Sequence, residues 1–283
     1  MPSDKKIPAS IGILTLNSGK TLRRALESVK DFAEIIVCDG NSADNTLALA
    51  REYGAKIIKQ YDSDEPNLRC EKDKANVRNR NMRGASFDWY FFMDSDDELK
   101  LEVALEICAI VENPNPPFLI YKMPARIFLD GKLIKHASVY PAYQTRLFSR
   151  ETGAYFKGPV HERIIFDKNR YRVGLMKNYY DFHWPKERIQ NFWTYQKKYA
   201  QWEVDTVGLG TFAGFLYWAV WRRLRIILGF VFWKIPRLYL IHGFKDSLPP
   251  RYELLVLGQH FYILYLFAKK AFLYGIRSEK GRN

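Results

Sequence analysis

The sequence predicts an α/β fold with a mostly parallel central sheet, followed by a basic helical region. Short apolar runs alternate with amphipathic helical patterns over residues 11–59, which is the order that right-handed crossover units produce. Three apolar runs end in polar clusters, and a parallel sheet gathers such clusters at the carboxyl edge of its strands. The charge then changes along the chain, because residues 186–283 carry +10 of the formal net charge of +13.

The length and composition allow a large buried core. The 283 residues are 47% hydrophobic, which excludes a disordered chain. We expect an N-terminal tail at residues 1–8, an α/β domain at 9–185 and a basic, aromatic-rich, amphipathic helical region at 186–283. The cysteines show neither zinc-ligand spacing nor an evident disulfide pattern, so a reducing compartment is expected. No signal peptide is expected, since the first apolar run is short and contains Gly12 and Thr15.

Strands and helices alternate along the first half of the chain. Uninterrupted apolar runs predict buried strands at residues 11–16, 34–38, 55–59 and 89–93. Apolar residues at helical spacing, with polar caps, predict helices at residues 22–29, 44–53, 71–85 and 99–111. Further along, short strands or hairpin arms are predicted at residues 118–123, 125–129, 132–136 and 144–148. A helix is predicted at residues 192–203.

The polar clusters at the strand ends are the candidate site. They are TLN at residues 15–17, DGNSAD at 39–44 and DSDD at 94–97. Three carboxylates in four residues repel one another unless a cation or hydrogen-bond donors hold them, so the third cluster is a candidate Mg²⁺ or Mn²⁺ site. The alternative is an Asp-rich N-cap of the next helix. Lys74 and Arg78 either neutralise a bound phosphate or belong to a solvated charged helix face.

The three clusters and their flanking residues resemble a known family. ASIGILTLNSGKTLRRALESV, AEIIVCDGNSADNTLALA and NRNMRGASFDWYFFMDSDDEL resemble, in order and spacing, the N-terminal half of family 2 glycosyltransferases, whose fold is called GT-A. The resemblance covers residues 9–185. It implies transfer of a sugar from a nucleotide-sugar donor, and a UDP-sugar is the donor that we expect.

The resemblance implies a role for individual residues. Asp39 resembles the carboxylate that holds the uracil or ribose side of the nucleotide, and Thr15 and Asn17 line the same pocket. Asp94 and Asp96 match the D-x-D pair that binds a divalent cation, Mg²⁺ or Mn²⁺, which bridges the donor diphosphate. The predicted donor-binding residues are Thr15, Leu16, Asn17, Asp39, Asn41, Lys74, Arg78, Asp94 and Ser95.

A second set of residues resembles one branch of the family. GPVHERI, DFHWPKERI and KKYAQWE look like the branch that includes lipopolysaccharide-core glucosyltransferases and peptide S-glycosyltransferases. This resemblance makes Glu162 the expected base of a single inverting displacement, with a pKa raised by partial desolvation. The alternative is a loop residue paired with His161 or Arg163. His183 is either a third metal ligand or a histidine packed beside Trp184.

The resemblance to this family also bears on the reaction and its acceptor. The Q-x-x-R-W signature of the family's processive synthases is absent, and the closest string is Gln144 to Leu147, so transfer of a single sugar is expected. The resemblance to the lipopolysaccharide-core branch implies a lipid-linked or lipopolysaccharide-core acceptor. One alternative is a nucleotidyltransferase, although its first strand would usually be followed by a Gly-rich, basic loop. The other is a non-catalytic, membrane-bound module that binds a nucleotide or sugar.

The C-terminal region alternates aromatic, apolar runs with basic residues. Neither of its uninterrupted apolar runs reaches the roughly twenty residues that span a bilayer. We expect amphipathic helices on an anionic membrane surface, which would make the protein peripheral (monotopic) at the cytoplasmic face of the inner membrane. The alternative is a helical subdomain packed on the α/β domain. No nucleic-acid partner is expected, because no DNA- or RNA-binding motif accompanies the charge.

Overall fold

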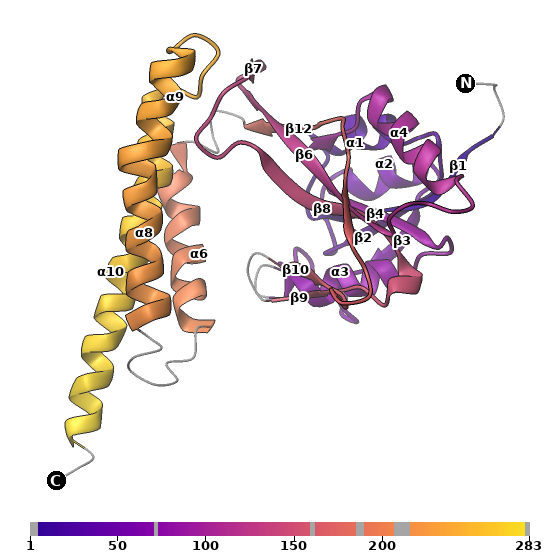
Figure 1. Cartoon of the computed structure of the whole chain (residues 1–283). Coiled ribbons are helices and arrows are strands. Elements are labelled where there is room, and N and C mark those ends of the chain that lie inside the picture. Colours follow the sequence, from indigo (N-terminus) through magenta and orange to yellow (C-terminus); the bar gives the residue numbers. More distant parts are fainter. Residues whose placement is uncertain (1–4, 71–72, 159–161, 185–189, 207–215, 281–283) are drawn as a thin grey trace. The chain divides into compact units, whose positions relative to one another are not determined.

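The chain divides into two units, which are drawn as ribbons in Figure 1. Our structure is a computed structural model that describes residues 5–70, 73–158, 162–184, 190–206 and 216–280. Unit 1 comprises residues 1–128 and 141–183, and unit 2 comprises residues 129–140 and 184–283. The boundary that the sequence predicts between residues 185 and 186 lies outside the described residues.

Unit 1 is built on a sheet whose first half is parallel, as the alternation of strands and helices predicts. The strands of this half run in the order β3-β2-β1-β4. They are β1 (Ile7–Thr15), β2 (Phe32–Asp39), β3 (Lys56–Lys59) and β4 (Trp89–Asp94). The first strand begins earlier than predicted and takes in two residues of the predicted tail, because Ile7 is buried and the N–H of Ile7 donates to the carbonyl of Asp31.

The second half of the sheet is largely antiparallel, so the sheet is mixed and not mostly parallel. Strand β8 (Ala142–Ser149) lies between β4 and β6 (Ile120–Leu129) and runs opposite to both. The short β5 (Asp97–Glu98) pairs antiparallel with β12 (Tyr180–Trp184), and β11 (Val173–Leu175) runs parallel to β6. Residues 118–123 and 125–129 are not separate arms, since β6 continues through Pro124.

Helices cover both faces of this sheet. They are α1 (Leu22–Ser28), α2 (Thr46–Glu52), α3 (Lys74–Arg83) and α4 (Leu101–Val111). Successive side chains of a strand point to opposite faces. In β4, Phe91 and Met93 accordingly join one buried cluster, which includes residues of α1 and α4, whereas Tyr90 and Phe92 join a second with Phe148. A 3₁₀ turn η1 (Arg150–Thr152) precedes a small antiparallel pair, β9 (Tyr155–Lys157) and β10 (Arg163–Ile165).

Helix α3 is fixed closely against the parallel strands. A Cβ at Gly12 would lie 1.9 Å from the hydroxyl oxygen of Tyr90 and 2.6 Å from Oδ1 of Asn81, so only glycine fits there. The Tyr90 hydroxyl donates to Oδ1 of Asn81 at 3.0 Å. The amide of Asn81 donates to the carbonyls of Ile13 and Ile36 at 3.3 and 3.2 Å. This attachment fixes the position of the basic side chains of α3 relative to the strand ends.

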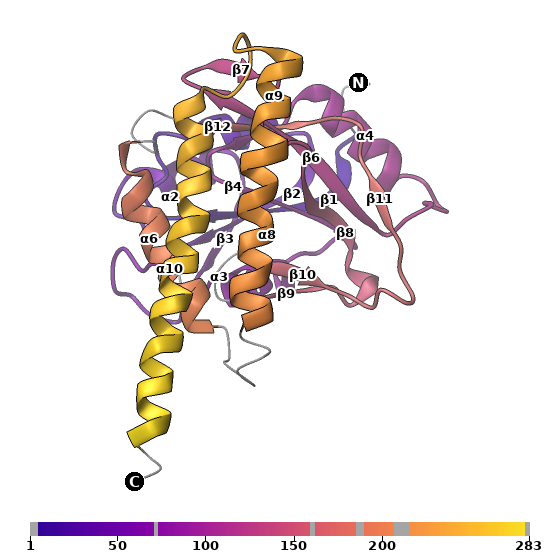
Figure 2. The ribbon, with the colours of Figure 1, turned by 60° about the vertical axis from the view of Figure 1, so that its left-hand side comes forward.

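Unit 2 is a bundle of helices. Helix α6 (Phe192–Thr206) packs on α10 (Pro250–Lys280) through a buried cluster made of Ala200, Val204, Ile263, Leu266 and Phe267. Figure 2 shows α10 running alongside α8. The intervening helical segments are η2 (Leu216–Trp221), α8 (Arg222–Gly229), η3 (Phe230–Lys234) and α9 (Ile235–His242). Among the described residues, no helix combines the length and the hydropathy that crossing a bilayer requires.

Residues 129–140, including β7 (Lys132–Ile134), belong to unit 2 although they precede its helices by more than fifty residues in the chain. The carboxylate of Glu253 is fully buried and accepts hydrogen bonds from the N–H of Ser138, at 2.9 Å, and from its hydroxyl. The rings of His136 and His242 stack with their centroids 3.8 Å apart. The C-terminal helices are therefore packed around a segment from the middle of the chain.

Candidate active site

The carboxyl ends of three parallel strands bring the polar clusters together. Strand β1 lies between β2 and β4, and the register places Thr15 opposite Asp39 and Leu14 opposite Asp94. The clusters at residues 15–17, 39–44 and 94–97 are well separated in the sequence, but neighbouring strands of a sheet are only about 4.8 Å apart. The sheet therefore gathers the clusters along one edge, as the sequence predicts.

Asp39 is a buried carboxylate that organises the loop after β2. Its Oδ1 accepts hydrogen bonds from the hydroxyls of Thr15, at 2.7 Å, and Ser42, at 2.6 Å. Its Oδ2 accepts the N–H of Ser42 at 2.7 Å. A carboxylate has about four lone-pair sites, so these three bonds leave room for one further donor. The contact of Asp39 with a nucleoside stays a prediction.

Asn17 and Asn41 fix the same loops through their side chains. Both adopt left-handed backbone conformations, with φ of 49° and 59°, which asparagine tolerates better than most residues. The Asn17 side chain accepts from the N–H of Ala43 at 2.9 Å and donates to Asn67 at 2.7 Å. The Asn41 amide donates to two backbone carbonyls, at 2.8 and 2.7 Å. The structure thus assigns these asparagines a part in loop geometry, and donor contact stays a prediction.

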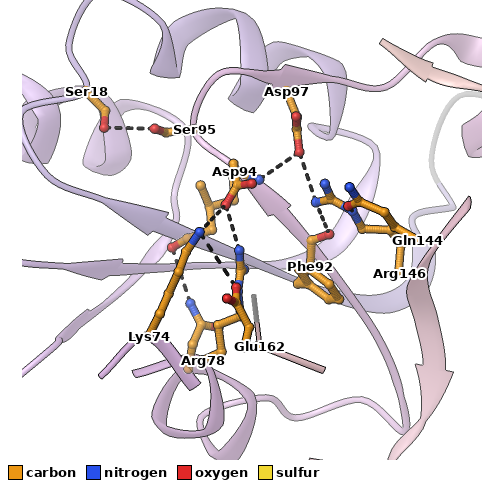
Figure 3. Close-up of polar contacts among 12 residues, drawn as sticks. Ser18, Lys74, Arg78, Phe92, Asp94, Ser95, Asp97, Gln144, Arg146 and Glu162 are labelled. Carbon is orange, nitrogen blue, oxygen red and sulfur yellow. Dashed lines mark hydrogen bonds and ion pairs between the residues drawn. The ribbon is translucent and has the colours of Figure 1, made fainter. Parts of the chain in front are cut away.

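Ser18 joins the loop after β1 to the loop after β4. Its Oγ accepts a hydrogen bond from the hydroxyl of Ser95 at 2.9 Å (Figure 3) and from the N–H of Leu16 at 3.3 Å. Ser95 and Leu16, both predicted as donor-binding residues, therefore lie beside one another at the candidate site.

Asp94, Asp96 and Asp97 form an acidic group at the end of β4. One carboxylate oxygen from each residue lies within 4.8 Å of the others. Oδ2 of the fully buried Asp97 accepts the N–H of Asp94 at 2.9 Å, whereas its Oδ1 is buried and has no hydrogen-bond partner among the described residues. A buried carboxylate oxygen without a partner is costly unless a cation binds it. The group therefore fits a hard divalent cation with oxygen ligands.

The helix-cap alternative for this cluster is wrong. Helix α4 begins at Leu101, and the residue at its N-cap is Lys100. Asp97 instead belongs to β5, where it pairs with Phe182 of β12. The three carboxylates therefore lie at the end of β4, in the turn and at the start of β5, and they do not cap the helix.

Arg78 connects the acidic cluster to Glu162 (Figure 3). Its Nη2 donates to Oδ1 of Asp94 and its Nε to Oε1 of Glu162, each at 2.7 Å. Nζ of Lys74 lies 3.8 Å from the same Asp94 oxygen and 3.7 Å from the same Glu162 oxygen. The alternative in which Glu162 pairs with the neighbouring Arg163 is not observed, because the carboxylate of Glu162 pairs with Arg78 and Lys74. His161 lies outside the described residues.

The basic residues lower the pKa values of both carboxylates. Burial by itself raises the pKa of Glu162, but the charges of Lys74 and Arg78 outweigh burial and lower the pKa below the usual value. The expected raised pKa of Glu162 is therefore wrong. Burial likewise raises the pKa of Asp94, and the charges of Lys74, Arg78 and Arg146 lower it well below its usual range. Both groups are ionised at neutral pH.

His183 lies near the cluster but outside the group of three carboxylates. Its Nε2 lies 3.4 Å from Oε2 of Glu98, and its ring stacks on Phe128 with centroids 5.1 Å apart. Burial and the charge of Arg24 lower the pKa of His183, which favours the neutral imidazole. His183 is thus a partly buried histidine packed against Phe128, and ligation of a metal by His183 stays a prediction.

Arg146 is a site residue that the sequence analysis did not identify. Its buried guanidinium donates to Oδ2 of Asp97 at 3.0 Å and to the Tyr180 hydroxyl at 3.1 Å. Burial raises the pKa of Asp97 to about 6, against the opposing charge of Arg146. The available signal was the spacing of Gln144 and Arg146, which places both on one face of β8, where Arg146 donates to Gln144 at 3.1 Å.

The fold and the site define an α/β protein with an acidic ligand group at the carboxyl edge of its parallel strands. Comparison with known proteins then gives the family. Residues 10–221 match the family model described as Glycosyl transferase family 2, so the chain belongs to that family.

Several curated relatives are named as glycosyltransferases of bacteria. An uncharacterized glycosyltransferase of Rickettsia bellii is 28% identical over 174 residues, which is 58% of this chain and 54% of that protein. The lipopolysaccharide core biosynthesis glycosyltransferase LpsC of Rhizobium meliloti is 28% identical over 169 residues, 58% of this chain and 59% of that protein. The chain thus matches little more than half the length of these relatives.

Among solved structures, S. aureus TarS 1-349 in complex with UDP-GlcNAc aligns with a TM-score of 0.48. The identity is 17%, and the alignment covers 89% of this chain and 79% of that chain. The family assignment rests on the sequence match and not on this structural similarity.

Proposed function

We propose that the protein is an inverting, metal-dependent glycosyltransferase that moves a single sugar from a UDP-sugar to a lipid-linked or lipopolysaccharide-core acceptor. The observation that carries the proposal is the group of Asp94, Asp96 and Asp97, placed beside the Asp39 loop at one edge of a family 2 domain. The name of the Rhizobium relative supports the choice of a lipopolysaccharide-core acceptor.

The roles of the residues follow from their places in the site. Asp94 and Asp96, with the unpartnered oxygen of Asp97, would hold Mg²⁺ or Mn²⁺. A bound cation would stabilise the negative charge that develops on the departing diphosphate. Lys74, whose side chain is 35% exposed, would pair with a donor phosphate. Glu162, ionised and 11% exposed, would accept the proton of the acceptor hydroxyl.

The donor assignment can be tested with a panel of nucleotide sugars. We expect the purified protein to release UDP from one UDP-sugar in the presence of Mn²⁺, and EDTA to stop the release. Thermal shift gives a second readout, because a ligand at about 100 times its Kd stabilises the native state by about 2.7 kcal/mol. Metal-dependent UDP binding without turnover of any donor would favour the non-catalytic module. No binding of any nucleotide would contradict the proposal.

A membrane-facing role for unit 2 is the second part of the proposal. Its helices expose large apolar side chains, among them Phe232 at 73%, Trp233 at 64% and Leu240 at 85%. Exposed basic residues occur on the same helical segments, namely Arg222, Arg225, Lys234 and Arg237. Aromatic side chains at headgroup depth and cations on anionic lipid are the features of an interfacial helix. We infer a peripheral protein at the cytoplasmic face of the inner membrane.

Flotation with phosphatidylglycerol vesicles tests this part. We expect the wild-type protein to float, and the double variant Phe232→Ser/Trp233→Ser to bind at least about tenfold more weakly, because each buried aromatic side chain contributes up to about 1.5–3 kcal/mol. The matched control is Leu175→Ser, which removes a side chain of unit 1 that is 59% exposed. Wild-type protein that stays with the soluble fraction would remove the membrane from the proposal.

A further inference from the structure

The guanidinium of Arg78 is a buried group that the proposed roles do not yet use. Only 3% of its side chain is exposed, and its two short hydrogen bonds go to Asp94 and Glu162. Its central carbon lies 4.5 Å from the ring centroid of Phe92 and 5.8 Å from that of Phe156, distances that allow cation–π attraction. The group is thus held by two aromatic rings and two carboxylates.

This placement argues against Arg78 as a residue that binds the nucleotide-sugar donor. A donor phosphate could reach Arg78 only after the guanidinium left both carboxylates, which would leave buried charges without partners. Lys74 is the basic residue of α3 that remains partly exposed beside the same two oxygens. The two basic residues that the sequence predicts as phosphate ligands therefore have different environments, and only that of Lys74 suits a phosphate.

The contacts of Arg78 instead relate two carboxylates that are distant in the sequence. Its two hydrogen bonds of 2.7 Å are shorter than the approaches of Lys74 to the same oxygens, at 3.8 and 3.7 Å. Asp94 ends β4, and Glu162 lies just before β10, 68 positions later. The planar guanidinium donates in fixed directions, so binding both carboxylates fixes the distance and angle between them. Arg78 and Lys74 both approach Glu162 through Oε1, so the bridge also sets which way Oε2 points.

We propose that Arg78 is a positioning residue: it holds Glu162 in a fixed orientation relative to the metal-binding Asp94, so that Oε2 is directed to the acceptor hydroxyl. The inference rests on the proposed function, in which Glu162 is the base. It assigns Arg78 to the geometry of the base and not to the binding of the donor. A misplacement of about 1 Å in such a group can cost about 100-fold in rate.

The test compares Arg78→Lys with the wild type in kcat and in UDP affinity. Lysine keeps the charge but cannot bridge two carboxylates with a planar fork. We expect kcat to fall about 10- to 100-fold, while the Kd of UDP with Mn²⁺ stays within about threefold. The control is Arg83→Lys, an exposed arginine of the same helix, which should leave both values unchanged.

If Arg78 instead binds the donor phosphates, Arg78→Lys should weaken UDP binding. Loss of a charge-assisted bond to the diphosphate weakens UDP binding about tenfold or more. That result, or an unchanged kcat, would overturn the inference. A further arm combines Arg78→Lys with Glu162→Gln: the double variant should be no slower than Glu162→Gln alone, and multiplying effects would contradict positioning through Glu162.

Two measurements keep the inference separate from folding and from the proposed function. Circular dichroism establishes whether each variant is folded at the assay temperature. If Arg78→Lys is not folded, Arg78→Gln is used in its place. If the wild type transfers no sugar, the proposed function fails by itself. The inference is then judged on UDP affinity and on a double-mutant cycle that measures Tm. The Tm changes of Arg78→Lys and Glu162→Gln should not add up to that of the double variant, and additive changes would contradict an interaction between the two residues.

Discussion

Replacement of Asp96 by alanine should lower sugar transfer by about 10³-fold, one of the two largest effects that we expect. A bound cation stabilises transition-state charge by several kcal/mol, and each 1.4 kcal/mol is a factor of about ten in rate. Asp96 is the carboxylate that we choose to replace, because the hydrogen bond from Arg24 goes to its backbone carbonyl and survives the substitution. Replacement of Asp94 or Asp97 would break the ion pairs with the buried Arg78 and Arg146.

The readouts are the initial rate of UDP release and the binding of Mn²⁺ by calorimetry. Both should be lost together in Asp96→Ala, while the thermal unfolding midpoint changes by no more than a few degrees. The exposed Asp31 provides the control, since Asp31→Asn removes a carboxylate far from the cluster in the sequence. Near-normal transfer by Asp96→Ala would refute the metal assignment.

Replacement of Glu162 by glutamine should lower kcat by about 10²–10⁴-fold, the range for loss of a general base. Glutamine keeps the size of the side chain and still accepts a hydrogen bond from Arg78, but it cannot take up a proton. Binding of UDP should change little, because the base acts on the acceptor. Glu52→Gln, a substitution at an exposed ion pair with Arg23, is the matched control. An active Glu162→Gln enzyme would show that another residue is the base.

The pH dependence of the wild type tests the environment of Glu162. Lys74 and Arg78 lower the pKa of Glu162 against burial, so its carboxylate stays ionised to lower pH than an ordinary glutamate, whose pKa is about 4.3. A base must be ionised to act, and activity is therefore retained as the pH falls to about 5. We expect kcat to be nearly constant between about pH 5 and 7 at saturating Mn²⁺. A midpoint near 6 that does not move with the Mn²⁺ concentration would indicate a base with a raised pKa. Protonation of Asp97, whose pKa burial raises to about 6, would instead compete with Mn²⁺ and move with its concentration.

The sequence determined the features that depend on neighbouring residues. The alternation of apolar runs and amphipathic helices is local, and it predicted the parallel half of the sheet and the gathering of the polar clusters along one edge. The polar clusters at residues 15–17, 39–44 and 94–97 follow those strands directly, so the edge of the sheet that carries Asp39 and Asp94 could be inferred before the structure. The same residues gave the family resemblance that the comparison confirms.

Only the tertiary structure decided the features that depend on distant residues. The antiparallel half of the sheet arises because β8 inserts between β4 and β6, which no local pattern encodes. The partners of Glu162 are on α3, and Arg78 is 84 positions away in the chain. Burial alone would raise the pKa of Glu162, but the positive charges of Lys74 and Arg78 on α3 reverse the direction of the pKa shift. Electrostatic energies depend on distances in space, and the sequence fixes those distances only through the completed fold.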